Sequence, residues 1–240
     1  MLSNIRVVLL NTSHPGNIGA SARAMKTMGL KALWLVNPKH FPDAAATARA
    51  SGADDVLASA RICSQLEEAL EGCRLVIGAS ARPRSLPCPV LTPRDCAQRV
   101  TEESNHGQVA ILFGCEQSGL SNTEMDRCHY LVRIFTSSDY CSLNLAAAVQ
   151  VIAYELFALQ VTRDREGVRE TVGHTPVDVG EMERFYVHLE QTLVDLGFLD
   201  PANPRQLMRR LRRLFNRARP DGNEINILRG ILTAAQQARK

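Results

Sequence analysis

The chain has 240 residues, 45% of them hydrophobic and 22% charged, and a formal net charge of +3. These values are ordinary for a soluble globular protein, and a chain of this length buries a full core without disulfides or metals. They exclude the small folds that depend on disulfides or metals for stability. The chain is therefore expected to form one large domain, or a main domain with a smaller one.

The charge is unevenly distributed along the chain. Residues 1–160 contain 14 Lys and Arg and 14 Asp and Glu, whereas residues 203–240 contain ten Lys and Arg against two acidic residues. A neutral body followed by a strongly basic tail indicates a polyanionic partner.

The seven cysteines and six histidines show no metal-ligand or redox spacing, so we expect no metal site. The N-terminal residues lack the apolar core of a secretory signal, and no apolar run approaches the length of a membrane span. An odd number of cysteines without C-x-x-C pairs suits a reducing compartment. We therefore expect a cytoplasmic protein that does not enter a membrane.

Short apolar runs alternate with helical patterns over the first two-thirds of the chain. The runs predict buried strands at 7–10, 33–36, 75–78, 109–113 and 130–134. Helices are predicted at 20–28, at 44–50, after a capping box at 64–67, near Pro93, after a capping box at 121–124, and at 144–160. This alternation predicts an α/β domain with a mostly parallel sheet over residues 1–161.

The remainder of the chain is predicted to be a linker and a helical extension. Residues 162–180 lack apolar periodicity and predict the linker. Residues 181–240 form the extension, with helices expected at 181–196, 204–219 and 223–239. Pro204 is expected at the first helical position of the second of these helices.

The helix predicted at 204–219 carries one apolar face and seven arginines without an acidic residue. Such a surface is either a solvated face or, because like charges repel, a site for an anionic partner. We predict nucleic-acid contacts from six arginines of the chain, Arg82, Arg84, Arg209, Arg210, Arg212 and Arg213.

The loop after the first predicted strand contains the pattern Asn17-x-Gly19-x-x-x-Arg23. Asn17 can cap the following helix, and Gly19 permits close approach of backbone or ligand. Arg23 lies one turn inside the helix and can reach back over the loop. The alternative is a capped surface helix with a solvated arginine. The absence of G-x-G-x-x-G gives a dinucleotide site little support.

A second loop follows the apolar run that ends at Phe113. In Phe113-Gly114-x-Glu116-x-x-Gly119, the glycine at the strand end lets a flat ligand ring approach the backbone. Glu116 either accepts a hydrogen bond from a ribose hydroxyl or fixes the loop. The spacing is equally compatible with a tight structural loop.

A third pattern, Ser142-Leu143-Asn144, precedes an alanine-rich helix. Serine and asparagine are ordinary N-cap residues there, and the free backbone N–H groups of a helix start also bind anionic groups. Ser142 lacks the G-x-S-x-G context of a hydrolase nucleophile. Cys141 is either a reactive thiol or a small buried apolar side chain.

Taken together, these segments resemble the motifs of the SPOUT (trefoil-knotted) RNA methyltransferases. The resemblance rests on 17–23, 111–120 and 142–144 with the helix that follows, in this order and spacing. Three more segments, 11–14, 184–190 and 226–232, narrow it to the bacterial tRNA ribose methyltransferases of that family. It covers nearly the whole chain apart from the linker.

The resemblance implies a deep trefoil knot in the C-terminal part of the sheet domain, which is an exception to the rule that chains do not knot. It implies a homodimer with the active site near the subunit interface. The implied reaction is 2′-O-methylation of the cytidine or uridine ribose at position 32 of the tRNA anticodon loop. S-adenosylmethionine would be bound in the knot, with S-adenosylhomocysteine as product, by Ala79, Ser80, Ala81, Gly114, Ile134, Cys141, Ser142, Leu143 and Asn144.

A ribose 2′-hydroxyl is a poor nucleophile while protonated, so the protein must align it and share its proton. The resemblance makes Arg23 the first candidate for catalysis. Because arginine stays protonated, we expect it to hydrogen-bond the developing alkoxide or hold the adjacent phosphate. Ser142 would orient the hydroxyl, and Asn17 would fix Arg23.

The sequence departs from the pattern of these enzymes at Cys115, where they commonly carry Arg, and at Ala79, where they commonly carry Thr. A non-catalytic RNA-binding protein with the same fold is therefore the alternative. A nucleotide-binding kinase or dehydrogenase is a weaker one, since G-x-x-x-x-G-K-[ST] and G-x-G-x-x-G are both absent.

Overall fold

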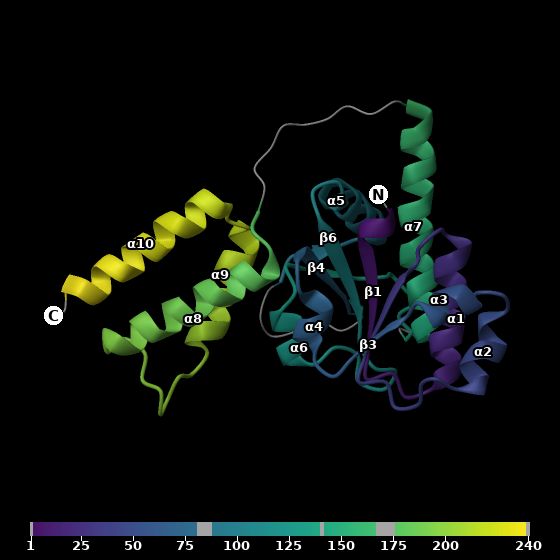
Figure 1. Ribbon diagram of the computed structural model, residues 1–240, viewed down its shortest axis with the longest axis horizontal. Coiled ribbons are helices and arrows are strands. Elements are labelled where there is room, and N and C mark those ends of the chain that lie inside the picture. Colours follow the sequence, from purple (N-terminus) through teal and green to yellow (C-terminus); the bar gives the residue numbers. More distant parts are fainter. Residues whose placement is uncertain (1, 81–87, 140–141, 167–175, 239–240) are drawn as a thin grey trace. The chain divides into compact units, whose positions relative to one another are not determined.

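The protein was analysed as a computed structural model that describes residues 2–80, 88–139, 142–166 and 176–238. The predictions for Ala81, Arg82, Arg84 and Cys141 lie outside these residues. The chain divides into two compact units, Met1–Glu170 and Thr171–Lys240, and Figure 1 labels most of their helices and strands.

The first unit is built on a seven-stranded sheet with the strand order β3-β2-β1-β6-β4-β7-β5. Every pairing in it is parallel, so the predicted α/β fold with a parallel sheet is confirmed. The strands are β1 (Ile5–Leu10), β2 (Ala32–Val36), β3 (Arg61–Cys63), β4 (Cys73–Ala79), β5 (Val90–Leu91), β6 (Gln108–Phe113) and β7 (Tyr130–Val132).

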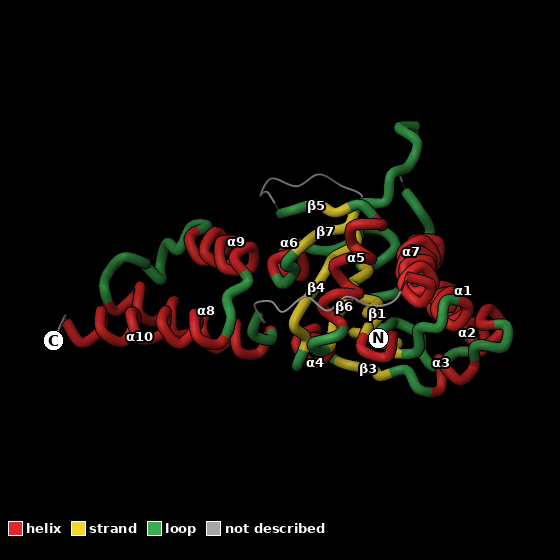
Figure 2. The backbone as a smooth tube through the Cα atoms, turned by 90° about the horizontal axis from the view of Figure 1, so that it is seen from above, coloured by secondary structure: helices red, strands yellow, loops and turns green. Residues whose placement is uncertain are grey.

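The central strands are mainly apolar because helices cover both faces of the sheet (Figure 2), and the polar residues Arg6, Arg74 and Gln108 lie at the first or second position of their strands. In β1 the neighbouring residues Val8 and Leu9 point to opposite faces, and both are fully buried. The same holds for Ile111 and Leu112 in β6. The short outer strands β3 and β5 were not predicted.

In the described part of the first unit, seven helices accompany the sheet. They are α1 (Pro15–Thr27), α2 (Ala44–Ala50), α3 (Asp54–Ala58), α4 (Leu66–Leu70), α5 (Pro93–Ser104), α6 (Asn122–Asp126) and α7 (Leu145–Glu166), and a 3-10 turn, η1 (Leu2–Asn4), precedes β1. The capping box of Ser121 and Glu124 is confirmed, as is the helix that begins at Pro93.

Two predicted helix starts in the first unit are wrong. Helix α1 begins at Pro15, and its N-cap is His14, whose Nδ1 accepts from the Gly16 N–H at 3.0 Å. The proline supplies the fixed φ of a first helical residue, so the helix starts before Asn17. The capping box predicted at 64–67 lies one residue later, between Gln65 and Glu68.

Gly19 is required by the packing of α1 on α2. A Cβ atom at Gly19 would lie 1.9 Å from the carbonyl oxygen of Ala46. The close approach expected at this glycine is therefore to the backbone of α2, and it allows α2 to pack directly against the first turns of α1.

Helix α7 is longer and more apolar than the sequence suggested. It runs to Glu166, so the first residues assigned to the linker are helical. Its segment Leu145–Thr162 is long and apolar enough, by length and composition alone, to cross a membrane, contrary to our expectation that no such run exists. About a third of that segment is buried, and α7 packs against α1 and α5. Tyr154 and Phe157 remain exposed on it.

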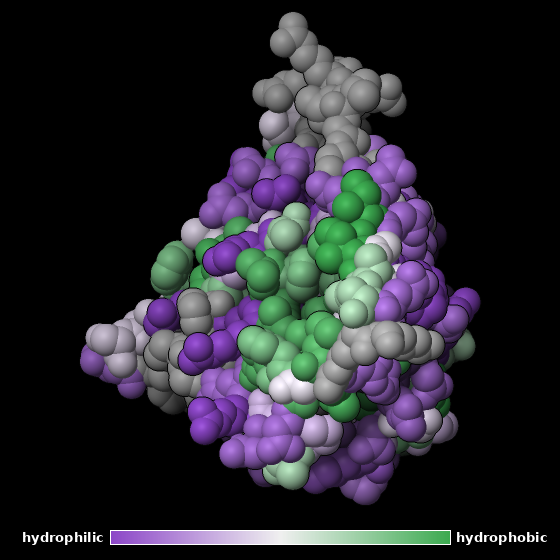
Figure 3. Space-filling view, turned by 90° about the vertical axis from the view of Figure 1, so that its left-hand side faces the viewer, coloured by the Kyte–Doolittle hydropathy of each residue, from purple (hydrophilic) through white to green (hydrophobic). Residues whose placement is uncertain are grey.

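Within residues 176–238, the second unit contains the helices α8 (Val179–Asp195), α9 (Leu207–Ala218) and α10 (Gly222–Ala238). Its core contains Phe185, Tyr186 and Ile225. Helix α9 begins at Leu207 and not at Pro204, because Arg205 adopts a left-handed φ of 49° that cannot belong to a helix. Apolar side chains are also exposed on this unit and gather on the face shown in Figure 3.

Arg212 of α9 is tied into the core of the second unit. Its guanidinium forms two hydrogen bonds to the Glu183 carboxylate, at 2.6 and 2.9 Å, and lies 4.3 Å above the Tyr186 ring. The Tyr186 hydroxyl donates to Asn216 at 2.7 Å, and burial raises the pKa of Tyr186. Residues 204–219 contain no acidic side chain, and Glu183 of α8 supplies one to Arg212.

Candidate functional site

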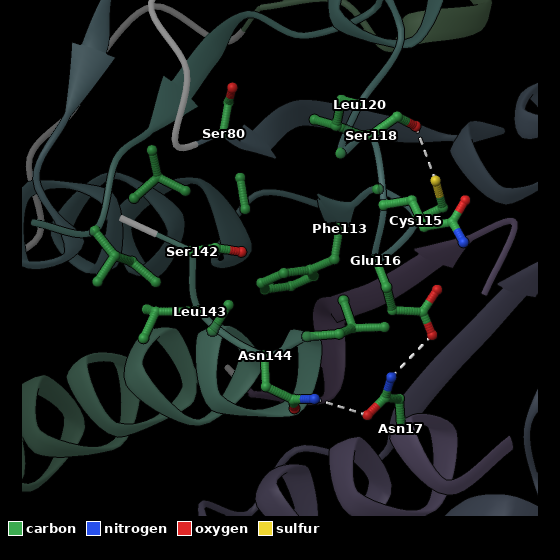
Figure 4. Close-up of a pocket in the computed structure, with 18 of the residues that line it drawn as sticks. Asn17, Ser80, Phe113, Cys115, Glu116, Ser118, Leu120, Ser142, Leu143 and Asn144 are labelled. Atoms are coloured by element: carbon green, nitrogen blue, oxygen red, sulfur yellow. Dashed lines mark hydrogen bonds between the residues drawn. The ribbon is translucent and has the colours of Figure 1, made fainter. Parts of the chain in front are cut away.

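A cavity of about 430 Å³ opens at the carboxyl ends of β4, β6 and β7, where they meet the start of α7 (Figure 4). In a parallel α/β sheet, ligands bind at this edge. The cavity is lined by Asn17, Ala79, Ser80, Phe113, Gly114, Cys115, Glu116, Gln117, Ser118, Gly119, Leu120, Val132, Ile134, Thr136, Ser142, Leu143, Asn144, Leu145 and Ala148.

The loop after β6 folds back on itself to form one wall. The Gly119 N–H donates to the Cys115 carbonyl at 2.9 Å, and Gly119 has a left-handed φ of 68°. A Cβ atom on Gly114 would lie 2.1 Å from the Gly119 carbonyl carbon. The absence of a side chain at Gly114 is therefore required by the loop's own backbone, which favours the tight structural loop over the ligand loop among the two interpretations of the sequence.

Glu116 holds this loop against the segment that leads into α1. Its carboxylate accepts from the Ser13 N–H at 3.0 Å, the His14 N–H at 3.2 Å and Asn17 Nδ2 at 2.9 Å. Burial alone raises the pKa of Glu116, but these hydrogen bonds to the charged form lower it to about 2. Of the two roles considered for Glu116, fixing the loop is the one that these contacts confirm.

Asn144 links the start of α7 to the same network. Its Oδ1 accepts from the Ala146 N–H at 2.9 Å, which confirms the predicted cap, and its Nδ2 donates to Asn17 Oδ1 at 2.9 Å. Asn17 therefore bridges Glu116 and Asn144 from inside the first turn of α1. The prediction that Asn17 caps α1 was wrong.

Arg23 does not line the cavity. It is exposed on α1, and its Nη1 lies 3.5 Å from the Ser51 hydroxyl at the end of α2. Arg23 lies six positions after Asn17 in α1. Its side chain is therefore rotated by about 240° around the helix axis relative to the side chain of Asn17. The hydrogen-bond partners of the Asn17 side chain are Glu116 and Asn144, so the expected contact between Asn17 and Arg23 is absent from the described structure.

The predicted cofactor residues that the structure describes all line one cavity, namely Ala79, Ser80, Gly114, Ile134, Ser142, Leu143 and Asn144. Sequence reasoning missed the apolar walls formed by Phe113, Leu120 and Val132. Phe113 and Val132 are the last residues of β6 and β7, and this position was the available signal for them.

Cys115 also lines the cavity, and its sulfur lies 2.9 Å from the Ser118 hydroxyl. That hydrogen bond lowers the pKa of the Cys115 thiol.

The cavity combines apolar walls with a polar edge. Phe113, Leu120 and Ile134 can enclose a flat ring, while Ser80 and Ser142 offer hydroxyl groups. The start of α7 adds backbone N–H groups, which favour a ligand's carboxylate. This arrangement suits a small molecule with an aromatic ring and a charged end. Among the described residues there is no group of three His, Cys, Asp or Glu side chains that could hold a metal ion.

The four arginines predicted on α9 differ in their surroundings. Arg210 is exposed, whereas Arg209, Arg212 and Arg213 are half-buried, and Arg212 is paired with Glu183. Arg217, seven residues after Arg210, is also exposed. It was not among the residues predicted to contact nucleic acid.

The parallel sheet and the cavity at its carboxyl edge are typical of an α/β protein that binds a small molecule at its strand ends. Two family models match the chain: the SpoU rRNA Methylase family over residues 4–154, and the tRNA methyltransferase TrmJ C-terminal domain over residues 180–240. Together they cover both structural units.

Individual relatives match the chain over nearly its whole length. The tRNA (cytidine/uridine-2'-O-)-methyltransferase TrmJ of Pectobacterium atrosepticum is 53% identical over 99% of this chain and 98% of its own. The crystal structure of TrmJ from Z. mobilis ZM4 has a TM-score of 0.82 and 33% identity, covering 95% of this chain and 97% of that one. A probable methylase family protein from Haemophilus influenzae Rd KW20 has a TM-score of 0.68 and 42% identity, covering 100% and 98%. The chain belongs to the SpoU methylase family and, within it, to the TrmJ methyltransferases.

Proposed function

We propose that this protein transfers a methyl group from S-adenosylmethionine to the ribose 2′-oxygen of the cytidine or uridine at position 32 of the tRNA anticodon loop. The observation that carries the proposal is the cavity in which the loops after β4, β6 and β7 meet the start of α7. The relative from Pectobacterium atrosepticum, whose name states this chemistry on tRNA, is 53% identical to the chain.

The residues present fit the proposed cofactor. The cavity of about 430 Å³ has the size of a small-molecule site, with apolar walls for an adenine ring and N–H groups at the start of α7 for a carboxylate. Bound S-adenosylmethionine would supply a methyl group activated on a sulfonium, with S-adenosylhomocysteine as product. The residues that would hold it are Ala79, Ser80, Gly114, Ile134, Ser142, Leu143 and Asn144, with Ala81 and Cys141 in segments that the structure does not describe.

The protein's own contribution is alignment. Ser142 lies on the cavity wall and can orient the ribose hydroxyl, and the bridge from Glu116 through Asn17 to Asn144 fixes the wall on which it stands. Holding the reacting atoms in line lowers the barrier by several kcal/mol, about 7–11 in favourable cases. Catalysis therefore depends on the rigidity of this wall.

We place Arg23 in the reaction through a homodimer. It is exposed and lies outside its own cavity, so it can act at the cavity of a second copy, where a permanent cation would steady the developing alkoxide. Helix α7 supplies an apolar surface for such a dimer through Tyr154 and Phe157, which are 55% and 39% exposed.

A complementation experiment tests this arrangement. Arg23→Ala and Ser142→Ala variants, each inactive alone, should regain about a quarter of wild-type activity when mixed, because one site in each mixed dimer carries both residues. No recovery from stable mixed dimers would place Arg23 and Ser142 at the same site of one chain.

We further propose that residues 1–161 form the trefoil-knotted SPOUT domain. Strand β6 pairs between β1 and β4, β7 lies beyond β4, and α7 then packs back against α1. A chain that returns in this way past strands already in place is compatible with threading. The residues between α7 and α8 would join this domain to a helical tRNA-binding domain, residues 181–240.

The proposed tRNA-binding surface includes α9, with its exposed Arg210 and the half-buried Arg209 and Arg213. Arg212, which was also predicted to contact nucleic acid, is paired with Glu183 instead. Arg82 and Arg84 would add to it from a segment that the structure does not describe. A cytoplasmic location follows from tRNA as substrate.

Substrates with one altered atom test the proposed reaction. A tRNA with 2′-deoxycytidine at position 32 should accept no methyl group, while the same tRNA with 2′-deoxyuridine at position 33 should be methylated normally. Methylation of the first substrate would contradict the proposed acceptor. Binding of tRNA without methylation of any substrate would favour the alternative, a non-catalytic RNA-binding protein.

A further inference from the structure

Phe135 has the most exposed large apolar side chain among the described residues, at 73%. It lies in the segment that follows β7. Its neighbours in the chain, Ile134 and Thr136, both line the cavity. Phe135 is therefore an aromatic ring turned to solvent at the mouth of the cavity.

The size of the cavity limits which part of an RNA can enter it, and so which part can contact the Phe135 ring. A volume of about 430 Å³ accommodates a small molecule and the group that reacts with it, but not a folded RNA. If a tRNA ribose reaches the cavity, as the proposed function requires, the adjoining nucleotides must lie on the surface around its mouth. Phe135 lies on that surface.

The surroundings of Phe135 suit RNA. Arg133 is exposed two residues before it, and no ion pair between described residues involves that arginine. Hydroxyl groups follow at Thr136, Ser137 and Ser138. Single-stranded bases stack on exposed aromatic rings, and guanidinium groups bind the phosphates between them.

We infer that Phe135 is a stacking platform for the base of a nucleotide next to the methylated ribose, with Arg133 holding a neighbouring phosphate. This inference rests on the proposed function and adds a residue that selects for an unpaired, splayed RNA loop. A duplex keeps its bases stacked on one another and presents none to the ring.

A second copy of the chain is the competing occupant. A stable interface buries about 800 Å² on each partner and has an apolar centre. Arg133, Thr136 and Ser137 lie close to Phe135 in the sequence, whereas Tyr154 and Phe157 of α7 offer two exposed aromatic rings on one helix. The surroundings of Phe135 therefore favour RNA.

Four variants separate stacking from simple apolar contact. Phe135→Ala should raise the KM for tRNA about 10- to 100-fold, in line with the loss of one stacked base. Phe135→Tyr should stay within about threefold of wild type, and Phe135→Leu should resemble the alanine variant because leucine has no ring to stack on. Ile62→Ala, at an exposed residue of β3, serves as the control and should change nothing.

A fluorescent base gives the direct readout. With 2-aminopurine at the nucleotide on either side of the methylated one, wild-type protein should quench the fluorescence of one of the two positions, and Phe135→Ala should not. The affinity for S-adenosylmethionine and the turnover at saturating tRNA should be unchanged in the variants, which shows that the enzyme itself still works.

Three outcomes would overturn the inference. They are an unchanged KM for tRNA in Phe135→Ala, a leucine variant as active as the tyrosine variant, and loss of self-association in Phe135→Ala, which would assign the ring to a second copy.

Discussion

Asn144 Nδ2 donates to Asn17 Oδ1 at 2.9 Å, across 127 residues of sequence. Asn17 in turn donates to the Glu116 carboxylate, and Asn144 Oδ1 caps α7 (Figure 4). These hydrogen bonds join the three segments on which the family resemblance rests. Each asparagine uses both its amide donor and its amide acceptor, so the two side chains fix each other's orientation.

Substitutions at Asn144 separate its two roles. Asn144→Ala removes the cap and the bridge and should lower the free energy of unfolding by about 1–2 kcal/mol. Asn144→Asp keeps an acceptor for the Ala146 N–H but cannot donate to Asn17. It should retain most of the stability while weakening the binding of S-adenosylmethionine. Denaturant unfolding and calorimetric titration measure the two effects, and equal stability losses in both variants would show that the cap contributes nothing.

Glu116 should make the stability of the first unit depend on acid. Its folded-state pKa of about 2 lies below the ordinary value of 4.5. The carboxylate therefore contributes stability that is fully present above pH 4.5 and is lost as the pH falls toward 2. Glu116→Gln should be less stable than wild type at pH 6, and the difference should shrink between pH 4.5 and 2.

Unfolding measured across that pH range tests this claim, with Glu71→Gln, an exposed carboxylate on the same unit, as the control. A difference between wild type and Glu116→Gln that stays constant from pH 6 to 2.5 would show that the ionised carboxylate is not what holds the loop.

Arginines on α9 should divide into two groups. Arg210→Ala and Arg217→Ala change exposed cations, so each should weaken tRNA binding and reduce the salt slope of log K by about one. Arg212→Ala removes the partner of Glu183 and the cation above Tyr186, so its main effect should be lower stability of the helical unit. Filter binding at several salt concentrations and thermal unfolding distinguish the two groups. A full salt-slope change in Arg212→Ala without loss of stability would reverse the assignment.

Gly114→Ala should disrupt the cavity wall. The new Cβ atom would lie 2.1 Å from the Gly119 carbonyl carbon, so the loop after β6 must shift. We expect destabilisation of about 1–3 kcal/mol and loss of cofactor binding. Gly222→Ala, where a Cβ atom meets nothing within 4 Å, is the matched control. Normal cofactor affinity in Gly114→Ala would show that this loop does not shape the site.

Local chemistry explains which elements could be predicted from the sequence. The apolar runs of β1 and β6, the proline that opens α5 and the capping box of Ser121 and Glu124 each carry their signal within a few residues. Strand β5 has only two residues, and no pattern can show over such a length.

Interactions between distant segments account for what the sequence did not reveal. Asn17 lies in the first turn of a helix and resembles a cap, but its partners are Glu116 and Asn144, on other segments of the unit. Arg212 resembles a phosphate ligand until Glu183 of α8 is placed beside it. In both cases a side chain typical of one local role is used in a contact that only the folded chain creates.

The most direct test of the proposed function is a single-turnover transfer of tritiated methyl from S-adenosylmethionine to unmodified tRNA, followed by nuclease digestion and nucleoside mapping. We predict label in 2′-O-methylcytidine or 2′-O-methyluridine from the anticodon loop, with the rate constant falling at least tenfold in Ser142→Ala. Label on a base, or no label with tRNA and S-adenosylmethionine both bound, would contradict the claim that this cavity methylates a ribose.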